Sequence, residues 1–170
     1  MSFYSHTQNW FNGELFEGKM VLIVGILMMI ISIFIWRYGT TPNAKALVIP
    51  ILSVGLFFSI GIGWMMRDYP QRMAQSERAF KENPAEFMLQ EKERVEGFQI
   101  LYTYSLIFAT FSFVLTIVGF GFLNNRIFQS ICIALLLISF TLIIIDHFSK
   151  ERSKIYYIEI LKHLNEPSGQ

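Results

Sequence analysis

Four long stretches of the chain contain no Asp, Glu, Lys or Arg, and each is strongly apolar. They cover Met20–Trp36, Ala46–Met66, Gly97–Asn125 and Ile127–Ile145. Each is close to or longer than the roughly 20 residues that a helix needs to cross a bilayer. The pattern predicts an all-α membrane protein with four transmembrane helices, at about 18–37, 45–66, 98–122 and 126–146.

The connections after the first and third spans are short. Gly39–Asn43 carries a turn signal in which Thr41 is a helix N-cap and Pro42 the first helical residue. Gly121–Asn125 is rich in Gly and Asn, which tolerate tight turns. Because short connections force neighbouring helices to run antiparallel, we expect two hairpins, one of spans one and two and one of spans three and four.

The connection between spans two and three is long, polar and helical in pattern. Asn83 is a helix N-cap, followed by Pro84 at the first helical position and by Glu86, which reaches back to the cap. We therefore expect segment 67–97 to hold a short helix, Gln71–Lys81, and a long extension that begins span three near Pro84. This helical pair either only links the two spans or also forms a docking surface for a partner.

Segments 147–164 and 1–17 are the remaining polar parts. Segment 147–164 has helical spacing of apolar residues and is expected to continue span four, so spans two to four all carry helical extensions. The N-terminal segment is rich in aromatic residues, which suit a membrane interface. We expect it to form a short interfacial helix that lies flat, with an aromatic lid over a lipid or ligand entrance as the alternative. Its apolar and aromatic residues are Phe3, Tyr4, His6, Trp10, Phe11, Leu15 and Phe16.

Composition and charge limit the class of protein to which the chain can belong. Charged residues are 16% of the 170 residues and hydrophobic residues 53%, whereas a soluble domain has about 25% charged residues. Residues 1–170 are therefore expected to form a single four-helix transmembrane domain. Eleven of the 14 Lys and Arg residues lie on the side of both termini and segment 67–97; the other three are Arg37, Lys45 and Arg126. The positive-inside rule places both termini in the cytoplasm, in a multi-pass protein of a bacterial inner membrane.

The spans hold no residue on which intramembrane chemistry is easily built. His6, His147 and His163 all lie outside the spans, which argues against haem bound between them. A single cysteine, Cys132, cannot form an internal disulfide. Proton-coupled transport normally needs an ionisable residue within the membrane. No cofactor is expected, and no basic tract suggests nucleic acid.

One weak cluster of polar residues is expected at the cytoplasmic ends of the spans. In an antiparallel bundle, these ends lie at one depth. A metal or proton site at this level is chemically conceivable, and the alternative is that these residues mark the membrane boundary and pair with one another. The cluster is Glu17, Arg67, Asp68, Asp146 and His147.

Two spans carry small or hydroxyl side chains on one face. In span two these are Gly55, Ser59 and Gly63, at intervals of four; in span three they are Ser105, Ala109, Ser112 and Thr116. Such residues let helices approach closely and hydrogen-bond across the contact. The alternative is a hydroxyl-lined conduction path, in which pore width and hydroxyl dipoles set the selectivity.

These observations favour a non-enzymatic membrane protein that acts through protein contacts, as an accessory, assembly or toxin-immunity protein. The expected partners are membrane lipids and either another protein or further copies of the chain, through the spans or the cytoplasmic helices. Two alternatives stay open: a channel or carrier for a small solute, and a lipid-active enzyme with its chemistry at the cytoplasmic interface, around Asp68, Asp146 and His147.

Overall fold

The computed structural model describes residues 3–165, and this part of the chain is helical apart from short connections. Within these residues, four helical stretches are long and apolar enough to cross a membrane, as the sequence predicts for an all-helical membrane protein. Helix α3 directly continues α2 within the second of these stretches. The helices are α1 (Phe3–Tyr38), α2 (Pro42–Arg67), α3 (Tyr69–Glu82), α4 (Pro84–Gly121) and α5 (Arg126–Asn165).

Side-chain caps start α2 and α4 where the sequence predicts them. The Thr41 hydroxyl accepts a hydrogen bond from the backbone N–H of Ala44 at 3.2 Å, and Pro42 is the first residue of α2. The Asn83 side chain accepts from the N–H of Glu86 at 3.3 Å and donates to the Glu86 carboxylate at 3.0 Å. Both caps satisfy N–H groups that have no partner inside the first helical turn, so both predictions are confirmed.

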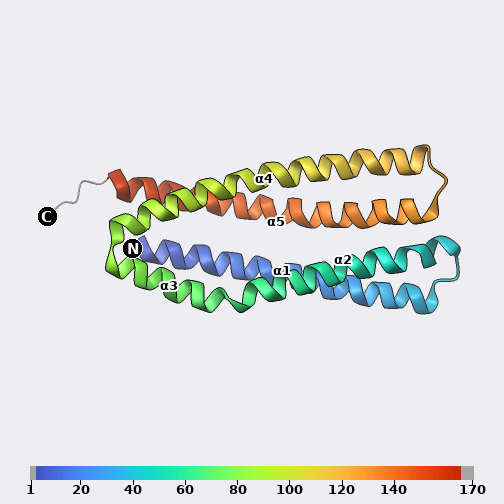
Figure 1. Ribbon diagram of the computed structural model, residues 1–170, viewed down its shortest axis with the longest axis horizontal. Coiled ribbons are helices and arrows are strands. Elements are labelled where there is room, and N and C mark those ends of the chain that lie inside the picture. The colour runs from blue at the N-terminus through green and yellow to red at the C-terminus, as the bar shows by residue number, and fades with distance from the viewer. Residues whose placement is uncertain (1–2, 166–170) are drawn as a thin grey trace.

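The helices form an elongated bundle with both ends of the described chain at one end (Figure 1). Helices α1 and α2 lie side by side, as do α4 and α5, and α3 leads from the first pair to the second. Helix α5 also packs against α1 and α2. Within residues 3–165, the backbone of α4 closely approaches only α3 and α5, whereas α2 and α4 have no close backbone contact.

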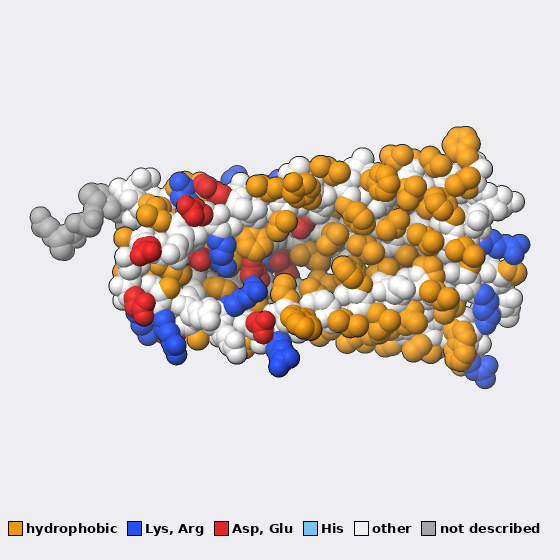
Figure 2. Space-filling model, viewed as in Figure 1, with side chains coloured by type: hydrophobic (Ala, Val, Ile, Leu, Met, Phe, Trp, Pro, Cys, Tyr) orange, Lys and Arg blue, Asp and Glu red, His pale blue; other side chains and the backbone are white. Residues whose placement is uncertain are grey.

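Two separate cores hold the bundle together. The first core lies among the charge-free stretches of the helices, a part of the bundle here called the apolar body. Its members are Val21, Met28, Ile51, Val54, Phe58 and Ala134. The second core lies at the end near the termini, where aromatic rings from α1 pack against α4 and α5. Its members are Phe3, Trp10, Phe87, Val95, Tyr156 and Ile160. Acidic and basic side chains gather around this end, here called the polar head (Figure 2). The middle of the surface visible in Figure 2 is mostly hydrophobic, and a few Lys and Arg side chains lie at the opposite end.

The prediction of a separate, flat N-terminal helix is wrong. Residues from Phe3 onward are the first turns of α1, a single helix of 36 residues. Phe3, Trp10 and Phe11 are only 4%, 3% and 5% exposed, and they pack inside the polar head. The segment contains no proline, and isolated glycines do not end a helix. Burial of these aromatic side chains against α3, α4 and α5 stabilises this arrangement more than a partly hydrated position at a membrane surface would.

Candidate functional site

The opening between α2 and α4 holds a cavity of about 440 Å³, here called the seam cavity. All five helices contribute to its lining. Its wall toward the apolar body consists of Val21, Phe57, Phe58, Ile62, Met65, Leu101, Leu142 and Ile145, and its wall toward the polar head includes Glu14, Glu17, Tyr69, Arg72, Tyr102, Asp146 and Ser149. Figure 2 shows acidic atoms recessed at the boundary between the two surfaces. The site is therefore apolar at one end and charged at the other.

Each carboxylate of the seam cavity has one partner from a different helix. Glu14 accepts a hydrogen bond from the Tyr69 hydroxyl, so α1 is tied to the start of α3. Asp146 accepts from the Ser105 hydroxyl, which ties α5 to α4. A carboxylate has about four acceptor positions, so these contacts leave acceptor capacity on both residues.

Glu17 forms an ion pair with Arg152 of α5. The guanidinium lies across α1 at Gly13, where an added Cβ atom would be 2.6 Å from Arg152 Nε. An alanine at this position would require the Arg152 side chain to shift. Burial raises the pKa of Glu17 above its ordinary value; Arg152 opposes this shift, whereas Glu14 and Asp146 add to it. The charges of Glu14 and Asp146 thus each act against the charge of Glu17.

The predicted polar cluster is only partly assembled. Glu17 and Asp146 line the same cavity, whereas Arg67, Asp68 and His147 are exposed and do not line it. The His147 ring instead contacts Phe148 edge to face. An α-helix has 3.6 residues per turn. Side chains one or two positions apart in the sequence therefore point in different directions, even when they lie at the same depth. Residues 3–165 contain no group of three His, Cys, Asp or Glu side chains placed to hold a metal ion.

The hydroxyl face of α4 lies mainly toward α5. Ala109 and Ser112 are buried, and the Ser105 hydroxyl bonds to Asp146 of α5. The Ser112 and Thr116 hydroxyls donate to carbonyl oxygens one turn earlier in α4, at 2.8 and 2.7 Å. These hydroxyls are satisfied within the protein, so the geometry supports helix packing rather than a hydrated path along this face.

The small residues of α2 divide into two groups. Gly55 meets Gly25 of α1 so closely that a Cβ added to Gly55 would lie 2.8 Å from the Gly25 carbonyl oxygen. Ser59 lies at the same crossing, since its hydroxyl would be 2.7 Å from a Cβ added to Gly25. Gly63 is exposed, and a Cβ there would have nothing within 4 Å. The predicted role in helix contact therefore does not extend to Gly63.

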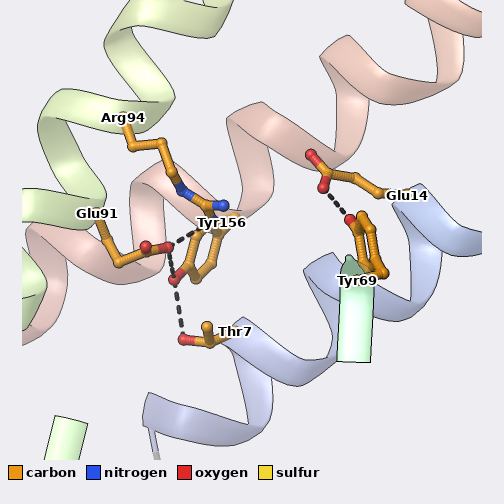
Figure 3. Close-up of polar contacts among 6 residues, drawn as sticks. All are labelled: Thr7, Glu14, Tyr69, Glu91, Arg94 and Tyr156. Carbon is orange, nitrogen blue, oxygen red and sulfur yellow. Dashed lines mark hydrogen bonds and ion pairs between the residues drawn. The ribbon is translucent and has the colours of Figure 1, made fainter. Parts of the chain in front are cut away.

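A buried polar network crosses the polar head (Figure 3). The Tyr156 hydroxyl donates to the Glu91 carboxylate at 2.8 Å, and the Thr7 hydroxyl lies 2.9 Å from the same oxygen of Tyr156. Arg94 forms an ion pair with Glu91 at 2.6 Å, and its guanidinium also lies over the ring of Phe11, 5.2 Å from the centroid. Burial, and then the neighbouring Glu91 charge, raise the pKa of Tyr156. The hydroxyl therefore stays protonated as a donor.

Sequence reasoning assigned no role to Glu91, Tyr156 or Tyr69. A signal for Glu91 exists in the sequence, because it stands between Phe87 and Val95 at intervals of four, on the apolar face of a helix. An acid in such a position requires a buried partner. Burial and the hydrogen bond to Glu14 raise the pKa of Tyr69, so this phenol also remains a neutral donor.

Comparisons with protein-family models, with curated proteins and with solved structures find no match to this chain. The site itself is therefore the basis for the function proposed below.

Proposed function

We propose that the chain is a multi-pass protein of a bacterial inner membrane that acts without catalysis, through protein contacts, as an accessory, assembly or toxin-immunity protein. In this proposal α1 with α2 and α4 with α5 form two antiparallel hairpins in the bilayer. The polar head, built from extensions of the spans, lies in the cytoplasm with both termini. The excess of Lys and Arg at this end supports the orientation.

The observation that carries the proposal is a row of exposed apolar side chains on α5 in the polar head. Phe148, Ile155 and Ile158 are 56%, 59% and 53% exposed, and their spacing places them on one face of the helix. We call this row the docking stripe. Exposed apolar side chains that share a face commonly mark a protein contact.

The position of the stripe favours a partner in water rather than lipid. Ile155 and Ile158 lie 10 and 13 residues beyond Ile145, the last residue of the fourth charge-free stretch. At 1.5 Å per residue these positions are about 15 and 20 Å farther along the helix. The headgroup layer is only about 5–8 Å thick on each side. Both isoleucines therefore extend past the lipid headgroups.

Affinity purification of the full chain from its own host, in mild detergent and at native expression level, tests the proposal. We expect one partner to be recovered with the wild type and to be lost in an Ile155→Ser/Ile158→Ser variant. The matched control, Glu93→Ser/Lys150→Ser, changes two exposed residues that lie off the docking stripe, and it should retain the partner. Repeated wild-type preparations without a partner, or equal recovery with both double variants, would contradict the proposal.

The other two function classes have less support from the geometry. The hydroxyls that suggested a conduction path are bonded within the protein. The residues that suggested lipid chemistry do not meet, because Asp68 and His147 are exposed away from the cavity that Asp146 lines.

A further inference from the structure

The seam cavity opens sideways, toward the surface that a bilayer would cover. Phe57 of α2 and Leu101 of α4 both line the cavity, yet they are 66% and 54% exposed. They therefore form the two edges of its mouth. The volume of about 440 Å³ lies within the range of small-molecule sites. A molecule already in the membrane can enter this cavity without crossing the polar head.

The polarity of the seam cavity changes along the same direction as that of a membrane lipid. Its apolar wall belongs to the charge-free stretches, whereas its carboxylates lie where those stretches end. Asp146 directly follows Ile145, and Glu17 precedes the first stretch by three residues. An acyl chain placed in the apolar part would therefore hold its headgroup at the level of the carboxylates.

The charges of the seam cavity select one kind of headgroup. Glu14, Glu17 and Asp146 supply three carboxylates, and only Glu17 has a basic partner, Arg152. Arg72 is the one basic residue among those that line the cavity, and within residues 3–165 it has no carboxylate at ion-pair distance. The arrangement thus offers acceptors for a cation and a free guanidinium for an anion. Guanidinium groups match phosphate geometry well.

We infer that the seam cavity binds a phospholipid whose headgroup carries a primary amine, as in phosphatidylethanolamine. One acyl chain lies against the apolar wall, the ammonium group donates hydrogen bonds to Glu14 and Asp146, and the phosphate lies at Arg72. A quaternary ammonium has no N–H to donate to these carboxylates, and a glycerol headgroup has no cation. Both of those lipids therefore bind more weakly.

Native mass spectrometry of the full chain in detergent micelles tests this, with phosphatidylethanolamine, phosphatidylcholine or phosphatidylglycerol added at equal concentration. We expect the ethanolamine lipid to be retained about fivefold or more over the other two, the size expected for charge-assisted contacts close to water. The Glu14→Gln/Asp146→Asn variant should lose this preference. An exposed pair outside the cavity, Glu82→Gln/Glu93→Gln, should keep it.

A second variant tests the cavity without changing its charges. Leu101→Trp places a larger side chain at the mouth and should lower retention of all three lipids, whereas Ile107→Trp, at a similarly exposed position of α4 outside the cavity, should not. Equal retention of the three lipids by the wild type, a preference for phosphatidylglycerol, or identical behaviour of the two tryptophan variants would overturn the inference. These variants leave the docking stripe unchanged, so failure here is distinguishable from loss of a protein partner.

Discussion

The hydroxyl of Tyr156 allows the most direct test of how the polar head is held together. Tyr156→Phe removes one oxygen atom and keeps the ring, which stacks on Trp10 with 5.5 Å between ring centroids and on Phe3 with 6.1 Å. The aromatic packing therefore stays the same. What is lost is the hydrogen bond to Glu91 and the contact with Thr7.

The structure sets the size of the expected effect. A hydrogen bond to a charged group contributes about 1.5–3 kcal/mol to stability. Glu91 is only 7% exposed and Thr7 is fully buried, so water replaces neither contact easily. The weakened Thr7 contact adds about 1 kcal/mol. Tyr156→Phe should therefore lower the free energy of unfolding of the polar head by about 2.5–4 kcal/mol.

Fluorescence of Trp10 reports on this part of the molecule, because its indole lies in the core of the polar head. The two other tryptophans, Trp36 and Trp64, are exposed and can be changed to Phe. Guanidinium titration of the full chain in detergent micelles then gives the free energy of unfolding of the polar head. A double-mutant cycle of Tyr156→Phe with Glu91→Gln measures how much of the loss belongs to this pair.

The neighbouring tyrosine is a matched control. The Tyr157 hydroxyl also donates to a carboxylate, Glu96, at 2.6 Å, but this contact is exposed. Water replaces exposed contacts readily, so Tyr157→Phe should be as stable as the wild type within error. Equal losses for the two variants, or a Tyr156→Phe variant as stable as the wild type, would refute the argument that burial makes this network important.

Three further predictions follow from other parts of the molecule. Gly55→Ala should lower stability in thermal unfolding by about 1–3 kcal/mol, because its Cβ would lie 2.8 Å from a backbone oxygen of α1. Gly63→Ala places its Cβ in open space and should be neutral or stabilising by up to about 1 kcal/mol in the same measurement. The pKa of Tyr156 is raised above the ordinary 10.0, so the unfolded chain releases this proton first as pH rises. The free energy of unfolding of the wild type should therefore fall above about pH 10. Denaturation measured at alkaline pH should show a shallower fall for Tyr156→Phe. In a cysteine-free background, an impermeant maleimide added to intact spheroplasts should label Thr40→Cys. It should label Glu93→Cys only after lysis. The reverse result would contradict cytoplasmic termini.

Local signals in the sequence were enough to locate the four apolar helical stretches and the starts of α2 and α4. The charge-free stretches show where helices of spanning length occur, because a bilayer requires about 20 apolar residues. Thr41 and Asn83 mark helix starts, since their side chains satisfy the nearest free N–H groups. These effects depend on residues within a few positions of each other, so no knowledge of the tertiary structure is needed to find them.

The candidate site could be anticipated only in part. Glu17 and Asp146 were identified because each stands at the end of an apolar stretch, and both line the seam cavity. Tyr69 and Arg72 were not, because their place in the cavity depends on how α3 begins after α2. The seam itself depends on the distance between α2 and α4, which no periodicity in either helix determines.

The sequence by itself determined that the chain is helical, that four of its helical stretches can cross a membrane, and where its charges are concentrated. Tertiary structure decided which polar and apolar side chains found partners. Phe3 and Trp10 became core residues, Glu91 became a buried network acid, and Gly55 but not Gly63 became a helix contact. The physical reason is that each helix presents similar residue types in several directions, and only packing between helices selects the direction that is buried.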